Sequence, residues 1–104
     1  MDYNYIANLD AQIPEIPKDS ILSRTFYQDE QLKAILFGFA SGQELSEHTA
    51  SVPAIIHILE GQAHLTLGDD EMEAQAGAWV RMPANMPHGI YANTQVKMLL
   101  IMLK

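Results

Sequence analysis

The sequence predicts a single all-β domain, built as a β-sandwich or β-barrel of short strands. Short runs rich in Ile, Leu, Val and aromatic residues recur at roughly ten-residue intervals, and turn residues separate them. A length of 104 residues fits one domain with one hydrophobic core. The one weak helix signal, over residues 69–75, is too short to nucleate a helix. We therefore expect strands throughout, with at most one short helix.

Residues 1–20 are predicted to form an extended arm, and residues 21–104 the barrel domain. The arm is largely polar and contains Pro14 and Pro17, which disfavour helix at their own positions and at the residue before them. The turn sequence Gly68-Asp69-Asp70 predicts a hairpin. Strands are expected at residues 21–27, 32–40, 54–59, 62–67, 72–76, 79–82, 88–92 and 96–103.

Two of these strands, residues 32–40 and 96–103, are apolar on both faces. One face of each packs against the core, so the other face needs a second cover. A second copy of the chain is the simplest cover, and we expect a homodimer.

The composition excludes several classes of function. Thirteen acidic and six scattered basic residues give a formal charge of −7, which repels a phosphate backbone, so no nucleic-acid partner is expected. The chain has no Cys, which excludes disulfides and thiol nucleophiles. No run approaches the ~18 apolar residues of a membrane span, and the first ten residues do not form a signal peptide. A cytoplasmic location without membrane contact is therefore expected.

Two stretches with fixed spacing resemble the two motifs of the cupin family. Gly42, His48 and Gly61 match the first motif, in which a Gly precedes His-x-His, a Glu and a second Gly. The second motif is Gly, Pro-x-Gly, His and Asn. It is matched by Gly77, Pro83 and His88. The resemblance covers roughly residues 32–103. It implies a double-stranded β-helix, which is a jelly-roll-type barrel, and it identifies the chain as similar to small bacterial RmlC-like cupins.

The departures from these motifs concern the metal ligands. In the family both His and the Glu of the first motif hold a metal together with the His of the second. The second His position is Ala50 here, the Glu position is Ala54, and only His48 and His88 survive. Asn85 and Ala92 replace the Gly and Asn of the second motif. Three interpretations are open for the two His: polar groups of a metal-free pocket, ligands of a metal completed by Glu44, Glu47 or solvent, or a structural role.

The alternation of side chains along the strands predicts what surrounds the two His. It places five apolar residues in the ligand pocket near them: Ile56, Ile58, Met82, Met86 and Ile90. His57 is expected to face away from the interior, and His64 to face solvent. Trp79 and Arg81 share one face of their strand. They either border the pocket or lie on the outer surface, and we favour the outer surface.

Three classes of function follow. The first is a small-molecule-binding cupin with a degenerate metal site, the second a metal-dependent cupin enzyme of the isomerase, sugar-acid-converting or dioxygenase type, and the third an interaction module. Any cofactor would be one weakly held divalent ion, Zn, Ni, Mn or Fe, at His48 and His88. Ala50 and Ala54 argue against the enzyme, and the retained His pair argues against the interaction module. We favour the first class. Catalytic residues cannot be assigned from the sequence, which leaves open whether the protein is an enzyme.

Overall fold

A computed structural model describes residues 2–104 as a β-structure with one short 3₁₀ helix. The element order within this range is η1 (Leu9–Gln12), β1 (Ile21–Gln28), β2 (Leu32–Phe39), β3 (Glu44–His48), β4 (Ala54–Glu60), β5 (Gln62–Leu67), β6 (Asp70–Gln75), β7 (Trp79–Met82), β8 (His88–Ala92) and β9 (Val96–Leu103).

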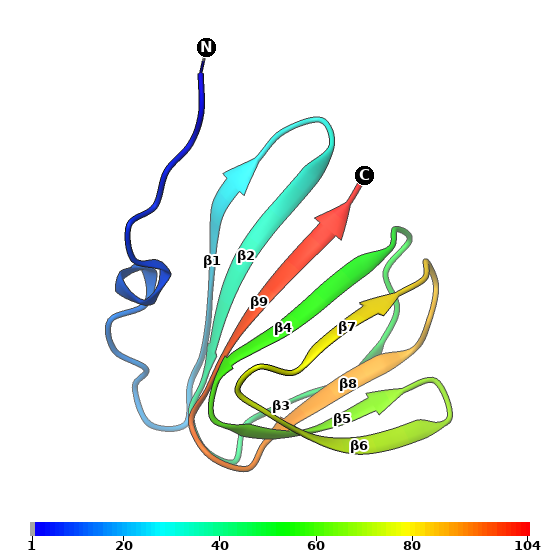
Figure 1. Cartoon of the computed structure of the whole chain (residues 1–104). Coiled ribbons are helices and arrows are strands. Elements are labelled where there is room, and N and C mark those ends of the chain that lie inside the picture. The colour runs from blue at the N-terminus through cyan, green and yellow to red at the C-terminus, as the bar shows by residue number, and fades with distance from the viewer. Residues whose placement is uncertain (1) are drawn as a thin grey trace.

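The strands form two antiparallel sheets that face each other across one core (Figure 1). The larger sheet has the order β1-β2-β9-β4-β7, and the smaller one has the order β3-β8-β5-β6. This arrangement confirms the predicted all-β, jelly-roll-type barrel. In residues 2–104 no helix is long and apolar enough to cross a membrane.

Period-two alternation builds the core between the sheets. On β4, Ala54, Ile56 and Ile58 are buried, while the residues between them are more exposed. Phe39 and Val96 of the same sheet are fully buried, and the smaller sheet contributes a second apolar row, Ala63, Leu65, Leu67, Ile90 and Ala92. The core is thus a continuous apolar layer between two sheets.

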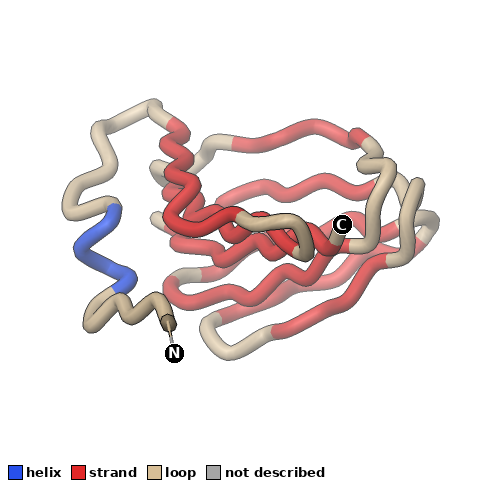
Figure 2. Tube along the Cα trace, turned by 90° about the horizontal axis from the view of Figure 1, so that it is seen from above, coloured by secondary structure: helices blue, strands red, loops and turns tan. Residues whose placement is uncertain are grey.

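The N-terminal arm lies across the outer face of β1 and β2 (Figure 2). Ile13 is only 3% exposed, and a Cβ placed on Gly38 of β2 would come within 2.8 Å of the Ile16 side chain. The carboxylate of Asp10 accepts a hydrogen bond from the buried ammonium of Lys97 on β9 and forms an ion pair with it. The arm contains the 3₁₀ turn η1, so it is not extended throughout its length.

One strand was not predicted, and one weak helix signal overlaps a strand that was predicted at residues 72–76. The strand β3 was not expected, because Glu44–His48 is polar and has exposed residues at four of its five positions. Pairing with β8 holds it in the sheet. The weak helix signal at residues 69–75 falls on β6, which pairs with β5 from Gln62↔Gln75 to Leu67↔Asp70. Cross-strand pairing therefore overrides the local preference for helix.

Candidate functional site

His48 and His88 lie face to face on the neighbouring strands β3 and β8. They are direct partners in the register of the two strands, and their ring centroids are 4.2 Å apart with the planes tilted by 58°. The structure therefore brings together the two His that the cupin motifs retain.

A β-bulge produces this pairing. Leu45 is opposite Ile90, so a regular ladder would bring Glu47 opposite His88, two residues further along each strand. The register shifts between Leu45 and His48, and the extra residue puts His48 there instead. Bulges commonly re-aim a side chain in this way.

Backbone carbonyls fix the orientation of both rings. The Nδ1 of His48 donates to Ser46 O at 3.0 Å, and the Nδ1 of His88 donates to Met86 O at 2.9 Å. Because a carbonyl oxygen can only accept, Nδ1 carries the hydrogen in both bonds. In the neutral ring, Nε2 then keeps its lone pair free. In each histidine, the Nδ1 bond to the carbonyl two residues earlier thus leaves Nε2 available as a hydrogen-bond acceptor.

The pair lies at the edge of the core and is open to solvent. His88 shares the inward face of β8 with Ile90 and is 9% exposed, whereas His48 belongs to the exposed residues. In residues 2–104, no buried side-chain nitrogen or oxygen lacks a hydrogen-bond partner, so the unbonded Nε2 of His88 reaches solvent. A small molecule can therefore approach both rings.

The sequence profile of the family described as "Cupin domain" matches residues 35–103. The chain belongs to the cupin family. Among solved structures it is similar to a cupin superfamily protein from Desulfitobacterium hafniense DCB-2, with 27% identity over 99% of this chain and 94% of that one, at a TM-score of 0.87. A conserved protein of unknown function from Streptococcus pyogenes is 31% identical over 100% of this chain and 90% of that one, at a TM-score of 0.85. An RmlC-like cupin from Desulfovibrio desulfuricans has 26% identity, 98% and 97% coverage and a TM-score of 0.81. A search of curated proteins finds no match.

The ligand positions that this cupin has lost lie on apolar or half-buried backbone. Ala54 is 3% exposed within the core, and Ala50 is half-buried, with its carbonyl accepting a hydrogen bond from Asn85 N at 2.7 Å. Over residues 2–104, no three His, Cys, Asp or Glu side chains gather in a way that could hold a metal ion. Glu44 and Glu47, the candidate additional ligands, therefore do not form such a group with the two His. Two imidazole nitrogens fall short of the three protein ligands typical of catalytic metal sites.

The apolar residues predicted for the pocket belong mainly to the packed core. Four of them are at most 6% exposed, namely Ile56, Ile58, Met82 and Ile90. The fifth, Met86, is half-buried beside His88. Ile56 and Ile58 also line a small cavity between the sheets, and neither histidine belongs to its lining. Their contact with a ligand stays a prediction.

The outer positions of the larger sheet agree with the sequence interpretation. His57 pairs with Trp79 on one side and Leu99 on the other, and it faces away from the interior. Trp79 is 59% exposed, and Arg81 is exposed on the same outer face. Neither Trp79 nor Arg81 borders the His48–His88 pair.

His64 has partners that the sequence analysis missed. Its ring lies between two carboxylates of β6, with Nδ1 2.6 Å from Glu73 Oε1 and Nε2 2.9 Å from Glu71 Oε1. The hydrogen bonds to Glu73 and then Glu71 raise the pKa of His64, and the bond from His64 lowers the pKa of Glu73. The hairpin turn at residues 68–70 is the signal that could have revealed this cluster, because it sets His64 opposite Glu73.

Proposed function

We propose that this cupin binds a small polar molecule at the His48–His88 pair, without a complete metal site of its own. The observation that carries the proposal is the orientation of the two rings. Both Nδ1 atoms are used by local carbonyls, and both Nε2 atoms are free on rings 4.2 Å apart. Two neutral imidazoles in this state accept hydrogen bonds from hydroxyl or amine groups. A polyol, a hydroxy acid or an amino alcohol has the donors to match.

The hydrogen bonding of the pair argues against a purely structural role. Each Nδ1 ties its ring only to the residue two positions earlier on its own strand, so neither bond links the two strands or the two sheets. A histidine retained for stability would be expected to use its remaining nitrogen within the protein. Here the remaining nitrogens are directed to solvent, where a ligand can use them.

A metal-dependent enzyme is the second candidate, and the same two Nε2 atoms favour it. Two imidazoles provide part of a site for a divalent ion such as zinc, nickel, manganese or iron, with water or a ligand carboxylate supplying the rest. An incomplete set of protein ligands predicts weak affinity, so such an ion would be removed by a mild chelator while the fold persists.

Imidazole-resolved NMR tests the proposal on the full chain. We expect Nδ1–H tautomers for His48 and His88, and changes of their Nε2 resonances when chelator-treated protein is titrated with a panel of polyols, hydroxy acids and amino alcohols. His57, on the outer face, is the internal control and should not respond. His48→Ala should abolish the response of His88 to any member that binds. If no probe perturbs either ring in the absence of metal but a divalent ion does, the metal-dependent candidate replaces the proposal.

A further inference from the structure

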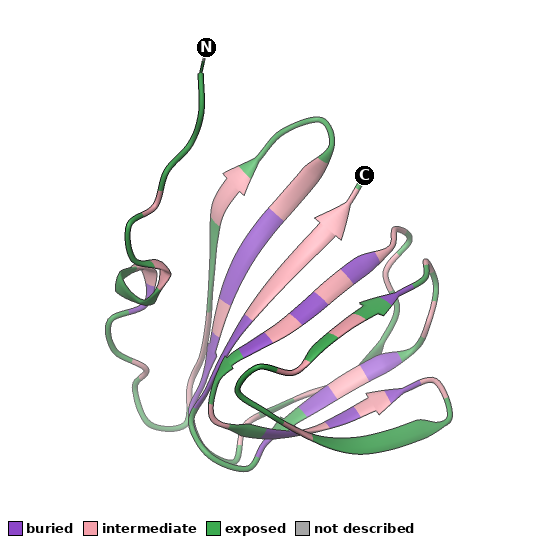
Figure 3. Cartoon of the chain, viewed as in Figure 1, coloured by how far each residue is buried: buried purple, intermediate pink, exposed green. Residues whose placement is uncertain are grey.

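A cavity of about 440 Å³ lies between the tip of the N-terminal arm and the strands β1 and β2. We call it the arm cavity; it is lined by Asp2, Tyr3, Asn4, Ile6, Phe26, Tyr27 and Ala34. Its volume is within the roughly 300–1,000 Å³ of small-molecule sites. Residues 2–5 of the arm are exposed, whereas Ala34 on β2 is 5% exposed, and Figure 3 shows the exposed arm beside the buried stretch of β2. The arm tip thus stands off the sheet and leaves room for a ligand.

A β-bulge in β1 brings two successive aromatic residues to this cavity. Thr25 is opposite Ile35 and Tyr27 is opposite Ala34, so Phe26 is an extra residue between two consecutive pairs. Neighbours in a regular strand point to opposite faces of the sheet, but a bulge interrupts this alternation. Both Phe26 and Tyr27 therefore line the cavity, and the short side chain of Ala34 opposite Tyr27 leaves space between them and the arm.

The turn between β1 and β2 fixes the Tyr27 ring. Its hydroxyl donates to Asp29 Oδ2 at 2.6 Å, and Asp29 Oδ1 accepts from the backbone N–H groups of Gln31 and Leu32 at 2.7 and 3.0 Å. The hydrogen bond to Asp29 raises the pKa of Tyr27, so the phenol stays neutral. Because the hydroxyl proton is committed to the turn, Tyr27 offers the cavity chiefly the face of its ring.

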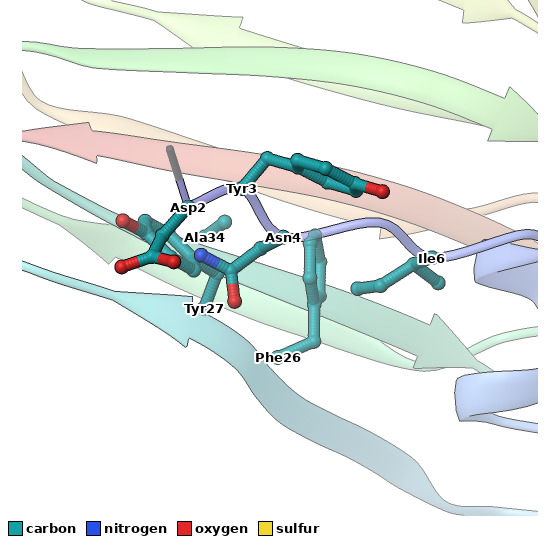
Figure 4. Close-up of a pocket in the computed structure, with 7 residues that line it drawn as sticks. All are labelled: Asp2, Tyr3, Asn4, Ile6, Phe26, Tyr27 and Ala34. Carbon is teal, nitrogen blue, oxygen red and sulfur yellow. The ribbon is translucent and has the colours of Figure 1, made fainter.

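The arm contributes a carboxylate and an amide to the other wall of the cavity. Figure 4 shows the side chains of Asp2 and Asn4 on the side of the arm that faces Phe26 and Tyr27, with the Tyr3 ring turned away. Within residues 2–104, Asp2 is the one charged residue in the lining, and no basic side chain belongs to it. The formal charge of −7 adds a negative background to the whole surface. The cavity thus combines aromatic faces with a net negative charge.

We propose that the arm cavity is a second ligand site, which binds a small organic cation with a quaternary ammonium group. The faces of aromatic rings carry a partial negative charge, and they attract such cations. The Asp2 carboxylate supplies the opposite charge, and the apolar side chains of Ile6 and Ala34 contact the alkyl groups. An uncharged apolar ligand would instead displace water from Asp2 without supplying a compensating charge, which costs free energy.

The polar groups of the cavity favour an alkylated ammonium over a primary one. A primary ammonium has three N–H donors, and each needs an acceptor when water is displaced. The side chains that line the cavity provide carboxylate or amide oxygens only at Asp2 and Asn4. A quaternary ammonium has no N–H group, so it leaves no donor unsatisfied. Such a cation also has no donor for the Nε2 atoms of His48 and His88, so the two sites differ in the ligand chemistry that they select.

Ring-resolved NMR of the full chain tests the site with choline and 3,3-dimethylbutan-1-ol, which have nearly the same shape and differ in charge. Choline should shift the ring resonances of Phe26 and Tyr27 with a dissociation constant roughly fivefold or more below that of the neutral analogue. Tetramethylammonium should shift the same two rings and leave His48 and His88 unchanged. Equal affinity for choline and its neutral analogue overturns the proposal. So does a parent in which neither ring responds to choline up to roughly 50 mM.

Variants assign the preference for the cation to individual side chains. Asp2→Asn removes the charge and Phe26→Leu replaces the ring by an alkyl group, so each should reduce the preference for choline over its neutral analogue by roughly threefold or more. Tyr5→Ser is the matched control, because Tyr5 is a 78% exposed aromatic residue of the arm outside the lining, and it should bind like the parent. An unchanged preference in both cavity variants, or its loss in the control, refutes the site. The probes and the reporting residues differ from those of the His pair, so either proposal can fail without the other.

Discussion

Restoring the two missing cupin ligands should convert the His48–His88 pair into a tight metal site. The variant is Ala50→His/Ala54→Glu, at the positions that the family motif assigns to a second His and a Glu. Ala54 is 3% exposed and lies between Met82 and Met102 on the neighbouring strands, so a carboxylate there is buried among apolar side chains. Without metal, desolvation and overpacking should lower the free energy of unfolding by about 2–5 kcal/mol.

Metal should reverse this loss. A ligand present at 1,000 times its dissociation constant stabilises the state that binds it by about 4 kcal/mol, which is the size of the expected deficit. The parent has two imidazole ligands and should gain far less from the same concentration of metal. The variant is therefore expected to be less stable than the parent in chelator and to approach or exceed it in zinc, nickel or manganese.

Titration calorimetry and urea unfolding, each with and without metal, measure the two effects. Ala50→His/Ala54→Gln is the control, because it has nearly the same bulk but lacks the charged ligand, and it should bind metal more weakly than the Glu variant. The reasoning is refuted if the parent already binds one metal ion with nanomolar affinity. It is also refuted if the double variant binds no more tightly than the parent.

Two further predictions concern the scaffold around the site. Gly61 has φ +90 and a Cβ there would lie 2.0 Å from Gln95 O, whereas Gly77 has φ +98 and open space around it. In urea unfolding, Gly61→Ala should therefore lower the free energy of unfolding by at least ~3 kcal/mol, and Gly77→Ala by only about 1–2 kcal/mol. Similar losses for both variants would contradict the steric argument. His64 has a raised pKa when folded, so its stabilisation is lost as pH rises through that pKa; Glu73 has a lowered one, so its stabilisation is lost as pH falls through that pKa. The pair should thus stabilise the fold most at pH values between the folded-state pKa of Glu73 and that of His64. NMR titration of Glu73→Gln should show a lower His64 pKa than in the parent. An unchanged His64 pKa would exclude Glu73 as the main cause of the shift.

Most strands could be predicted because their apolar residues alternate or run continuously between turn residues. The ranges 62–67, 79–82, 88–92 and 96–103 agree with the structure at both ends. The strand Glu44–His48 could not be predicted in this way, because it lacks an apolar row and depends on pairing with β8. The 3₁₀ turn in the arm could not be predicted either, because four residues are too few to show a periodic apolar pattern.

The proximity of His48 and His88 followed from the cupin resemblance, but the β-bulge in β3 that places them opposite each other did not. A bulge depends on a mismatch between two strands, and one of these strands was itself unrecognised. The sequence pattern of β5 alone does not reveal the two carboxylates around His64, because both lie on the neighbouring strand β6. Cross-strand pairs become visible only when the register of a hairpin is worked out from its turn.

The bulge also supports the proposal that this pair serves ligand binding and not packing. An extra residue in β3 interrupts the ladder with β8, and its local effect is to exchange Glu47 for His48 opposite His88. A regular pairing would give a longer uninterrupted ladder, so stability alone does not favour the bulge. At Ala54, by contrast, a buried carboxylate without a metal would cost free energy, and an apolar side chain packs there instead. The barrel interior around Ala54 is thus apolar core, while the solvent-exposed edge of the core has the β-bulge. This bulge presents two free Nε2 atoms, which is the arrangement that a hydrogen-bonded ligand requires.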